Sequence, residues 1–125
     1  MRGGPYPIRS GKERLGRGGA RMILHCVFCN FSDEARAVEQ HAVLSELRDF
    51  ALSIRRCMSA EFGPNRDFEQ KTQDYSYGFV LQFKDKDALD EYAKHPTHMA
   101  LAARLVDLCV GGADSILVYD LEVED

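Results

Sequence analysis

The chain has 125 residues, of which 45% are hydrophobic and 29% charged, as in an ordinary soluble globular protein. This length suits one domain with its own core, and we expect no membrane span because no apolar run is long enough. The formal net charge is −4 at pH 7, and an acidic domain argues against nucleic acid as the main ligand. The first residues lack the apolar centre of a secretory signal, so we expect a cytoplasmic protein.

Residues 1–21 differ from the rest of the chain. They are rich in glycine and hold six basic residues but one acidic residue. Because they show no hydrophobic periodicity, we expect a disordered leader, followed by one folded domain over residues 22–123. A short basic tail of this kind would suit docking on an anionic surface, but it is more often a solvated tail.

Cys26 and Cys29 have the C-x-x-C spacing found in zinc sites. The residues around them are strand-like, and side chains three apart in a strand point to opposite faces. No second pair follows in the sequence to complete a tetrahedral site. We therefore expect reduced, structural cysteines, with no metal and no cofactor.

Apolar spacing predicts the element order β-α-β-β-α-α-β, which is that of a ferredoxin-like α+β fold with a four-stranded antiparallel sheet. Ser32 is expected to N-cap the first helix and Asp85 the second, and a polar loop is expected at 63–74. The expected strands are 23–31, 54–62, 75–83 and 115–123, and the expected helices are 33–52, 86–95 and 97–108.

Such a sheet has one face under helices and one bare face. The bare face is also expected to be apolar, with Leu24, Cys26, Phe28, Val80, Ile116 and Val118. An apolar bare face on a small domain indicates a protein interface. Two copies packed sheet to sheet would cover it, so we expect a homodimer.

The segment 92–98 joins the second and third expected helices. Pro96 disfavours helical geometry at His95 and suits the first turn of a new helix, so one helix ends and another begins here. His98 continues the apolar stripe that includes Leu101. We therefore expect its imidazole to be buried near a helix N-terminus and neutral, the form that can accept a proton.

Several segments together resemble the stress-responsive dimeric α+β barrel (Dabb) family: Met22 to His25, Phe62-Gly63 with Asn65, residues 75–83, residues 90–98, and Ile116 to Asp120. The resemblance covers roughly residues 22–123, and its most specific part is the His-Pro-x-His sequence at 95–98. It implies a ferredoxin-like protomer that pairs into a dimeric α+β barrel.

The resemblance extends to polyketide cyclases of the olivetolic acid cyclase type, which work without a cofactor. Their tyrosine–histidine pair matches Tyr92 and His98, and their first-strand histidine matches His25. The first helix departs from the cyclase pattern, with Leu44 and Leu47 where the cyclases have aromatic residues. Phe79 is also bulkier than the valine that would align with it.

The candidate catalytic residues are His98, Tyr92 and His25. His98 would remove or relay a proton next to a carbonyl group while Tyr92 positions it or donates to the oxygen. The expected pocket for a small hydrophobic ligand is lined by Val27, Leu47, Tyr77, Phe79, His95 and Met99.

Two alternatives remain open. One is a non-catalytic, stress-linked structural or interaction module whose barrel is filled by its own side chains. The other is a cofactor-free monooxygenase or haem-handling barrel, since other families share this architecture. An open cavity lined by the two histidines and Tyr92 would favour the enzyme, and a cavity plugged by Phe79 and Met99 would favour the module.

Overall fold

The computed structural model describes residues 21–124. The expected leader lies outside the described residues, except for Arg21, which is the first residue of the first strand. The elements are strands β1 (Arg21–Cys29), β2 (Cys57–Pro64), β3 (Tyr77–Phe83) and β4 (Ile116–Glu124), helices α2 (Ala37–Ser53), α3 (Lys86–Lys94) and α4 (Pro96–Asp107), and the 3-10 helix η1 (Gly112–Ser115).

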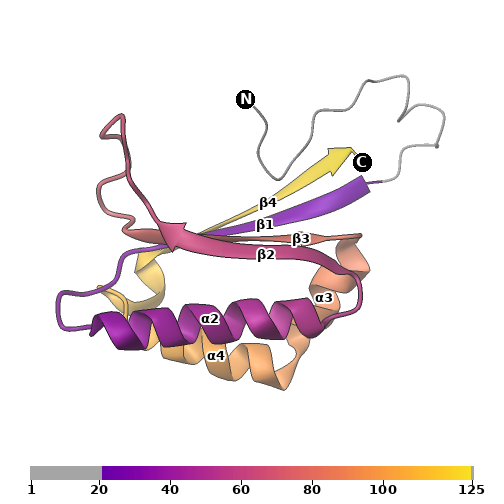
Figure 1. The fold of residues 1–125 in the computed structure, drawn as a ribbon, viewed down its shortest axis with the longest axis horizontal. Helices are drawn as coiled ribbons and strands as arrows, with labels where there is room; N and C mark the ends of the chain where they lie inside the picture. Colours follow the sequence, from indigo (N-terminus) through magenta and orange to yellow (C-terminus); the bar gives the residue numbers. More distant parts are fainter. Residues whose placement is uncertain (1–20, 125) are drawn as a thin grey trace.

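The four strands form one antiparallel sheet in the order β2-β3-β1-β4. Helices α2 and α4 run side by side along one face, and α3 lies at one end of that layer (Figure 1). We term the side of the sheet that the helices cover the helix face, and the opposite side of the sheet the bare face. The predicted ferredoxin-like α+β fold is confirmed. None of the helices in this part of the chain has the length and apolar character that a membrane span requires.

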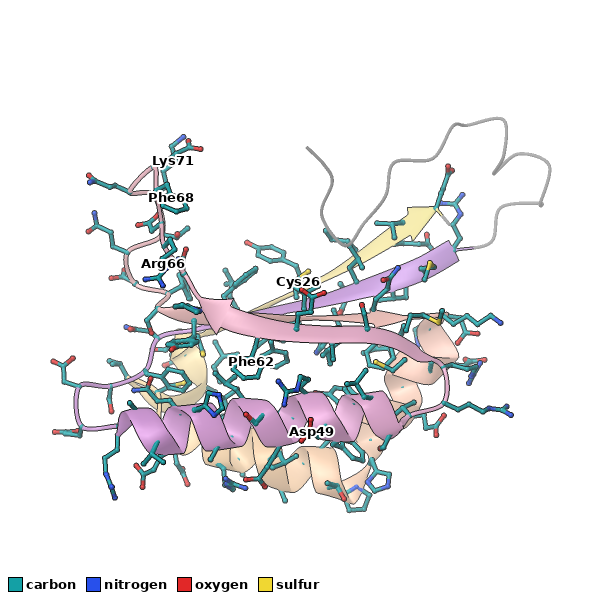
Figure 2. All side chains as sticks on the ribbon, viewed as in Figure 1. Cys26, Asp49, Phe62, Arg66, Phe68 and Lys71 are labelled. Carbon is teal, nitrogen blue, oxygen red and sulfur yellow. The ribbon has the colours of Figure 1, made fainter. Side chains whose placement is uncertain are left out.

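The core lies between the helix face and the helices. Burying a large apolar side chain contributes roughly 1.5–3 kcal/mol. The largest fully buried side chains are Tyr92, Phe83, Leu44, Leu47, Leu81, Val43 and Cys29. Cys29 belongs to this core, whereas Cys26 lies on the bare face (Figure 2). The two cysteines of the C-x-x-C spacing therefore point apart, as strand alternation predicts.

Helix α2 begins at Ala37, so the prediction that Ser32 caps it was wrong. The Ser32 N–H instead donates to the Leu108 carbonyl at 2.8 Å, which ties this segment to the end of α4. The chain then turns before the helix starts. Arg36 takes the N-cap position, and its N–H donates to the Glu39 carboxylate at 3.4 Å.

Strands β2 and β3 both begin later than predicted. Residues 54–56 form the turn after α2, with the Cys57 N–H donating to the Ile54 carbonyl at 2.9 Å. Residues 75 and 76 belong to the connection before β3, since the Tyr75 N–H donates to the Thr72 carbonyl at 3.0 Å. Each segment begins with a residue type common in strands, Ile54 or Tyr75, but local turns hold the two backbones.

The prediction that Ile116 and Val118 of β4 lie on the bare face was wrong, because the opposite side of this strand lies there. Three residues of β4 lie on the bare face, each directly opposite an apolar residue of β1: Leu117 opposite Phe28, Tyr119 opposite Cys26, and Leu121 opposite Leu24. Ile116 and Val118 lie on the helix face. Both sides of this strand carry apolar residues, so alternation alone does not say which side meets the helices. The bare face is nevertheless strongly apolar.

Candidate functional site

The joint between α3 and α4 is built as the sequence predicts. Asp85 caps α3, its carboxylate accepting from the Ala88 N–H at 2.9 Å. His95 has extended geometry between the helices, and its Nδ1 accepts from the Thr97 N–H at 3.0 Å. Pro96 is in the first turn of α4. The break places residue 92 at the end of one helix and residue 98 at the start of the next.

Tyr92 is the centre of a cluster of aromatic rings on the helix face. Its side chain has no exposed surface. Its ring centroid lies 4.4 Å from that of His98 and 5.9 Å from that of His25. The ring centroids of Phe83 and Phe50 lie 5.3 Å and 5.8 Å from that of Tyr92. We term these five residues the Tyr92 cluster; it brings all three candidate catalytic residues together.

The Tyr92 hydroxyl is buried and has no hydrogen-bond partner among the described residues. Leaving such a group unpaired costs free energy, so an orphaned hydroxyl in a core is unusual. Burial raises the pKa of this hydroxyl above its ordinary value of 10.0. The group is therefore a neutral hydrogen-bond donor at physiological pH, not a base.

His98 is the partly exposed member on α4. Its Nδ1 lies 3.0 Å from the Ala93 carbonyl oxygen. Because a carbonyl can only accept, Nδ1 carries the proton and Nε2 is left as an acceptor. Burial lowers the pKa of His98, the charge of His25 adds to this, and the Ala93 hydrogen bond opposes it. The neutral imidazole is favoured.

His25 reaches the cluster from β1, and its side chain is 13% exposed. Its Nδ1 lies 2.6 Å from Oδ1 of Asp120, directly opposite on β4. The carboxylate accepts this hydrogen bond and fixes the orientation of the imidazole ring. Sequence reasoning did not assign a role to Asp120. Only the pairing of β1 with β4 places it beside His25.

The expected pocket residues fall into two groups. Val27, Leu47 and Phe79 are buried in the core, and Tyr77 packs against the Phe31 ring at 5.5 Å. His95 is exposed at the joint with its ring 4.8 Å from that of Phe50, and Met99 is 61% exposed. Met99 therefore does not plug the space beside Tyr92.

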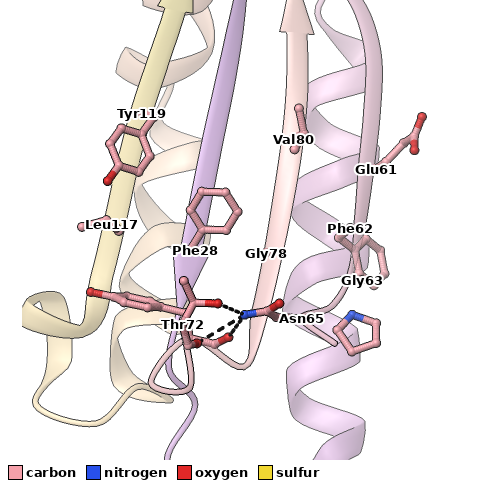
Figure 3. Close-up of a pocket in the computed structure, with 12 residues that line it drawn as sticks. Phe28, Glu61, Phe62, Gly63, Asn65, Thr72, Gly78, Val80, Leu117 and Tyr119 are labelled. Atoms are coloured by element: carbon pink, nitrogen blue, oxygen red, sulfur yellow. Dashed lines mark hydrogen bonds between the residues drawn. The ribbon is translucent and has the colours of Figure 1, made fainter. Parts of the chain in front are cut away.

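A separate hollow lies on the bare face, which the sequence predicted to be apolar but not to be hollowed. This sheet-face groove has a volume of about 510 Å³ (Figure 3). Its floor is apolar, with Phe28, Val80, Leu117 and Tyr119, and Asn65 closes one end. Across the described residues, no group of three or more histidine, cysteine or acidic side chains is placed to hold a metal ion.

The antiparallel sheet, the helices on one face and the apolar bare face define a ferredoxin-like α+β domain. The chain matches the family described as Stress responsive A/B Barrel Domain (Dabb) over residues 23–123. It therefore belongs to the Dabb family.

Three known proteins illustrate the relationship. A dimeric ferredoxin-like protein of unknown function from Jannaschia sp. CCS1 is 43% identical, with a TM-score of 0.77 over 82% of this chain and 99% of that one. The stress-response A/B barrel domain-containing protein HS1 of Arabidopsis thaliana is 24% identical over 78% of this chain and 86% of its own length. A hydroxynitrile lyase from Passiflora edulis has a TM-score of 0.72 over 83% of this chain and 94% of that one, but is 9% identical, which shows a shared fold alone.

Proposed function

We propose that the chain acts as a homodimer whose Tyr92 cluster binds a small hydrophobic carbonyl compound and performs acid–base chemistry on it. The observation that carries this proposal is the buried Tyr92 hydroxyl, which has no hydrogen-bond partner among the described residues and belongs to a ring that contacts both histidine rings. A carbonyl oxygen would satisfy this donor. The phenyl rings of the cluster would pack against the apolar part of the ligand.

In this scheme His98 is the general base. Its Nε2 accepts a proton from the carbon next to the carbonyl group, while the Tyr92 hydroxyl donates to the oxygen on which negative charge develops. His25, held by Asp120, is a second imidazole that would take part in proton relay. Positioned acid–base groups of this kind accelerate reactions by roughly 10²–10⁴-fold. That is enough for enolisation of an activated carbonyl compound such as a poly-β-ketone.

The homodimer is supported by the bare face. Tyr119 and Leu121 on β4 are 51% and 50% exposed and lie beside the apolar residues of β1. Contiguous apolar surface of this kind marks interaction sites. Several similar solved structures are described as dimeric ferredoxin-like proteins, among them the 43% identical one.

The alternative is a non-catalytic structural or interaction module. It is favoured by the complete enclosure of Tyr92 within its ring cluster, which leaves the core filled by the chain's own side chains.

The test compares the wild type, His98→Ala and Tyr92→Phe on a panel of linear poly-β-keto thioesters. We expect the wild type to turn over at least one of these and both variants to lose most of that activity. His41→Ala is the matched control, because this exposed histidine on α2 packs against Phe62 outside the cluster. Equal rates for wild type and His98→Ala would reject the site, and inactivity of every protein would favour the module.

A further inference from the structure

The connection between β2 and β3 is an arm that stands away from the sheet. Residues 65–76 rise on the side opposite to α2 and α4, as Figures 1 and 2 show. The base of the arm borders the bare face, because Asn65, Thr72 and Tyr75 line the sheet-face groove together with residues of β1 and β4. Any protein that packs on the bare face therefore lies beside the arm.

Two side chains hold the arm in shape. The Asn65 amide donates to the Thr72 hydroxyl at 2.9 Å and to the Tyr75 carbonyl at 2.7 Å (Figure 3). Oδ1 of Asp67 accepts from the Lys71 N–H at 2.8 Å, the Thr72 N–H at 3.0 Å and the Thr72 hydroxyl at 2.9 Å. Burial alone would raise the pKa of Asp67, but these three bonds lower it. The hydrogen bonds of Asn65 and Asp67 therefore hold the arm in one ordered conformation.

This arm presents one aromatic side chain to solvent. Phe68 is 91% exposed, well above Met99 at 61% and Val38 at 60%, the next most exposed large apolar residues of the described chain (Figure 2). Single exposed apolar residues are common on proteins. Here the residue lies on a pre-ordered turn beside an apolar face, and a pre-ordered aromatic loses little conformational entropy on binding.

The arm extends the surface that the bare face offers to a partner. Four strands of seven to nine residues make a sheet of roughly 19 by 26 Å, or about 500 Å², at the usual strand spacing and rise. A stable interface buries about 800 Å² on each partner. The arm stands beside this face and would add its own surface to such an interface.

We propose that the arm is a clasp for a second copy of this chain, with Phe68 buried between the two protomers. The inference rests on the proposed homodimer and adds the contact that closes it. The occupant is a second copy because the bare face is continuous with the arm and because the 43% identical relative is described as dimeric.

Fluorescence provides a direct test, because the chain contains no tryptophan. In Phe68→Trp, the single tryptophan should emit at shorter wavelength and resist acrylamide quenching at concentrations where the protein is dimeric. Both properties should be lost on dilution to the monomer. Val38→Trp on α2 is the matched control, since that position is exposed on the helix side, and its emission should not depend on concentration.

Sedimentation equilibrium gives the second readout. Phe68→Ala should raise the dimer dissociation constant by about tenfold or more, as for an aromatic interface anchor, and Val38→Ala should leave it unchanged. A dimer of unchanged affinity, with the tryptophan of Phe68→Trp exposed to solvent, would overturn the clasp but not the homodimer. A monomer at every concentration would overturn both, and protection of that tryptophan only by a different protein would overturn the second copy as occupant.

Discussion

Replacing Tyr92 with phenylalanine removes one oxygen atom from the centre of the core while leaving the ring in place. The four surrounding rings lie 4.4–5.9 Å from the Tyr92 ring, centroid to centroid, and all of these contacts can persist in the variant. The substitution therefore isolates the contribution of the hydroxyl group to folding.

A buried hydroxyl without a partner costs about 1–3 kcal/mol, because it loses its bonds to water and gains none. Its removal leaves a small void, which offsets part of that gain. We therefore expect Tyr92→Phe to be more stable by about 1 kcal/mol, equivalent to about 4 °C in Tm for a domain of this size. Tyr92→Ala should instead lose about 3–5 kcal/mol, since it empties the ring site.

Urea unfolding of the three proteins at pH 7.5, followed by circular dichroism, measures these differences. If Tyr92→Phe is less stable than the wild type by about 1 kcal/mol or more, the hydroxyl is hydrogen-bonded in the folded protein, and the reasoning from an orphaned donor fails. Higher stability together with lost turnover would identify a group retained for function at a cost in stability.

Three further predictions concern other parts of the fold. Burial lowers the pKa of His98, so the unfolded chain binds a proton at this residue more readily than the folded chain does. The free energy of unfolding should therefore fall as the pH drops below about 6.5. Denaturant titrations across pH 5–8 should show this dependence on pH in the wild type and a flatter one in His98→Gln. A Cβ at Gly78 would lie 2.7 Å from Cδ1 of Phe28, so Gly78→Ala should destabilise by about 1–3 kcal/mol; thermal unfolding should show most of this loss absent in a Phe28→Ala background. Asp85 caps α3 and also binds Arg56 at 2.8 and 3.0 Å, so Asp85→Ala should lose about 1–2 kcal/mol in urea unfolding, and Asp85→Asn, which keeps an acceptor, should lose less.

The features predicted correctly from the sequence are those that depend on neighbouring residues. Asp85 caps a helix because its carboxylate reaches an N–H three residues ahead. The break at Pro96 follows from a ring that restricts the residue before it. The missed start of α2 shows the limit of such signals. Ser32 is a suitable cap, but a bond to Leu108, far along the chain, holds its backbone in another conformation.

The candidate site divides in the same way. Tyr92 and His98 come from one short segment, where periodicity and the proline predict two apolar helix stripes, and the family resemblance implies that the two residues form a pair. The partner of His25 could not be found in this manner, since Asp120 lies 95 residues away. The exposed Phe68 gave no signal either, because composition does not show that a polar loop is ordered by its own hydrogen bonds.

The sequence by itself determined the order of elements, the helix break and the presence of two apolar sheet faces, since these depend on side-chain spacing and local backbone sterics. The tertiary structure decided which side of β4 meets the helices, which carboxylate holds His25 and where the arm stands. The physical reason is strand register. Alternation with a period of two distinguishes the two sides of a strand, but only pairing with a distant strand assigns each side to the core or to the surface.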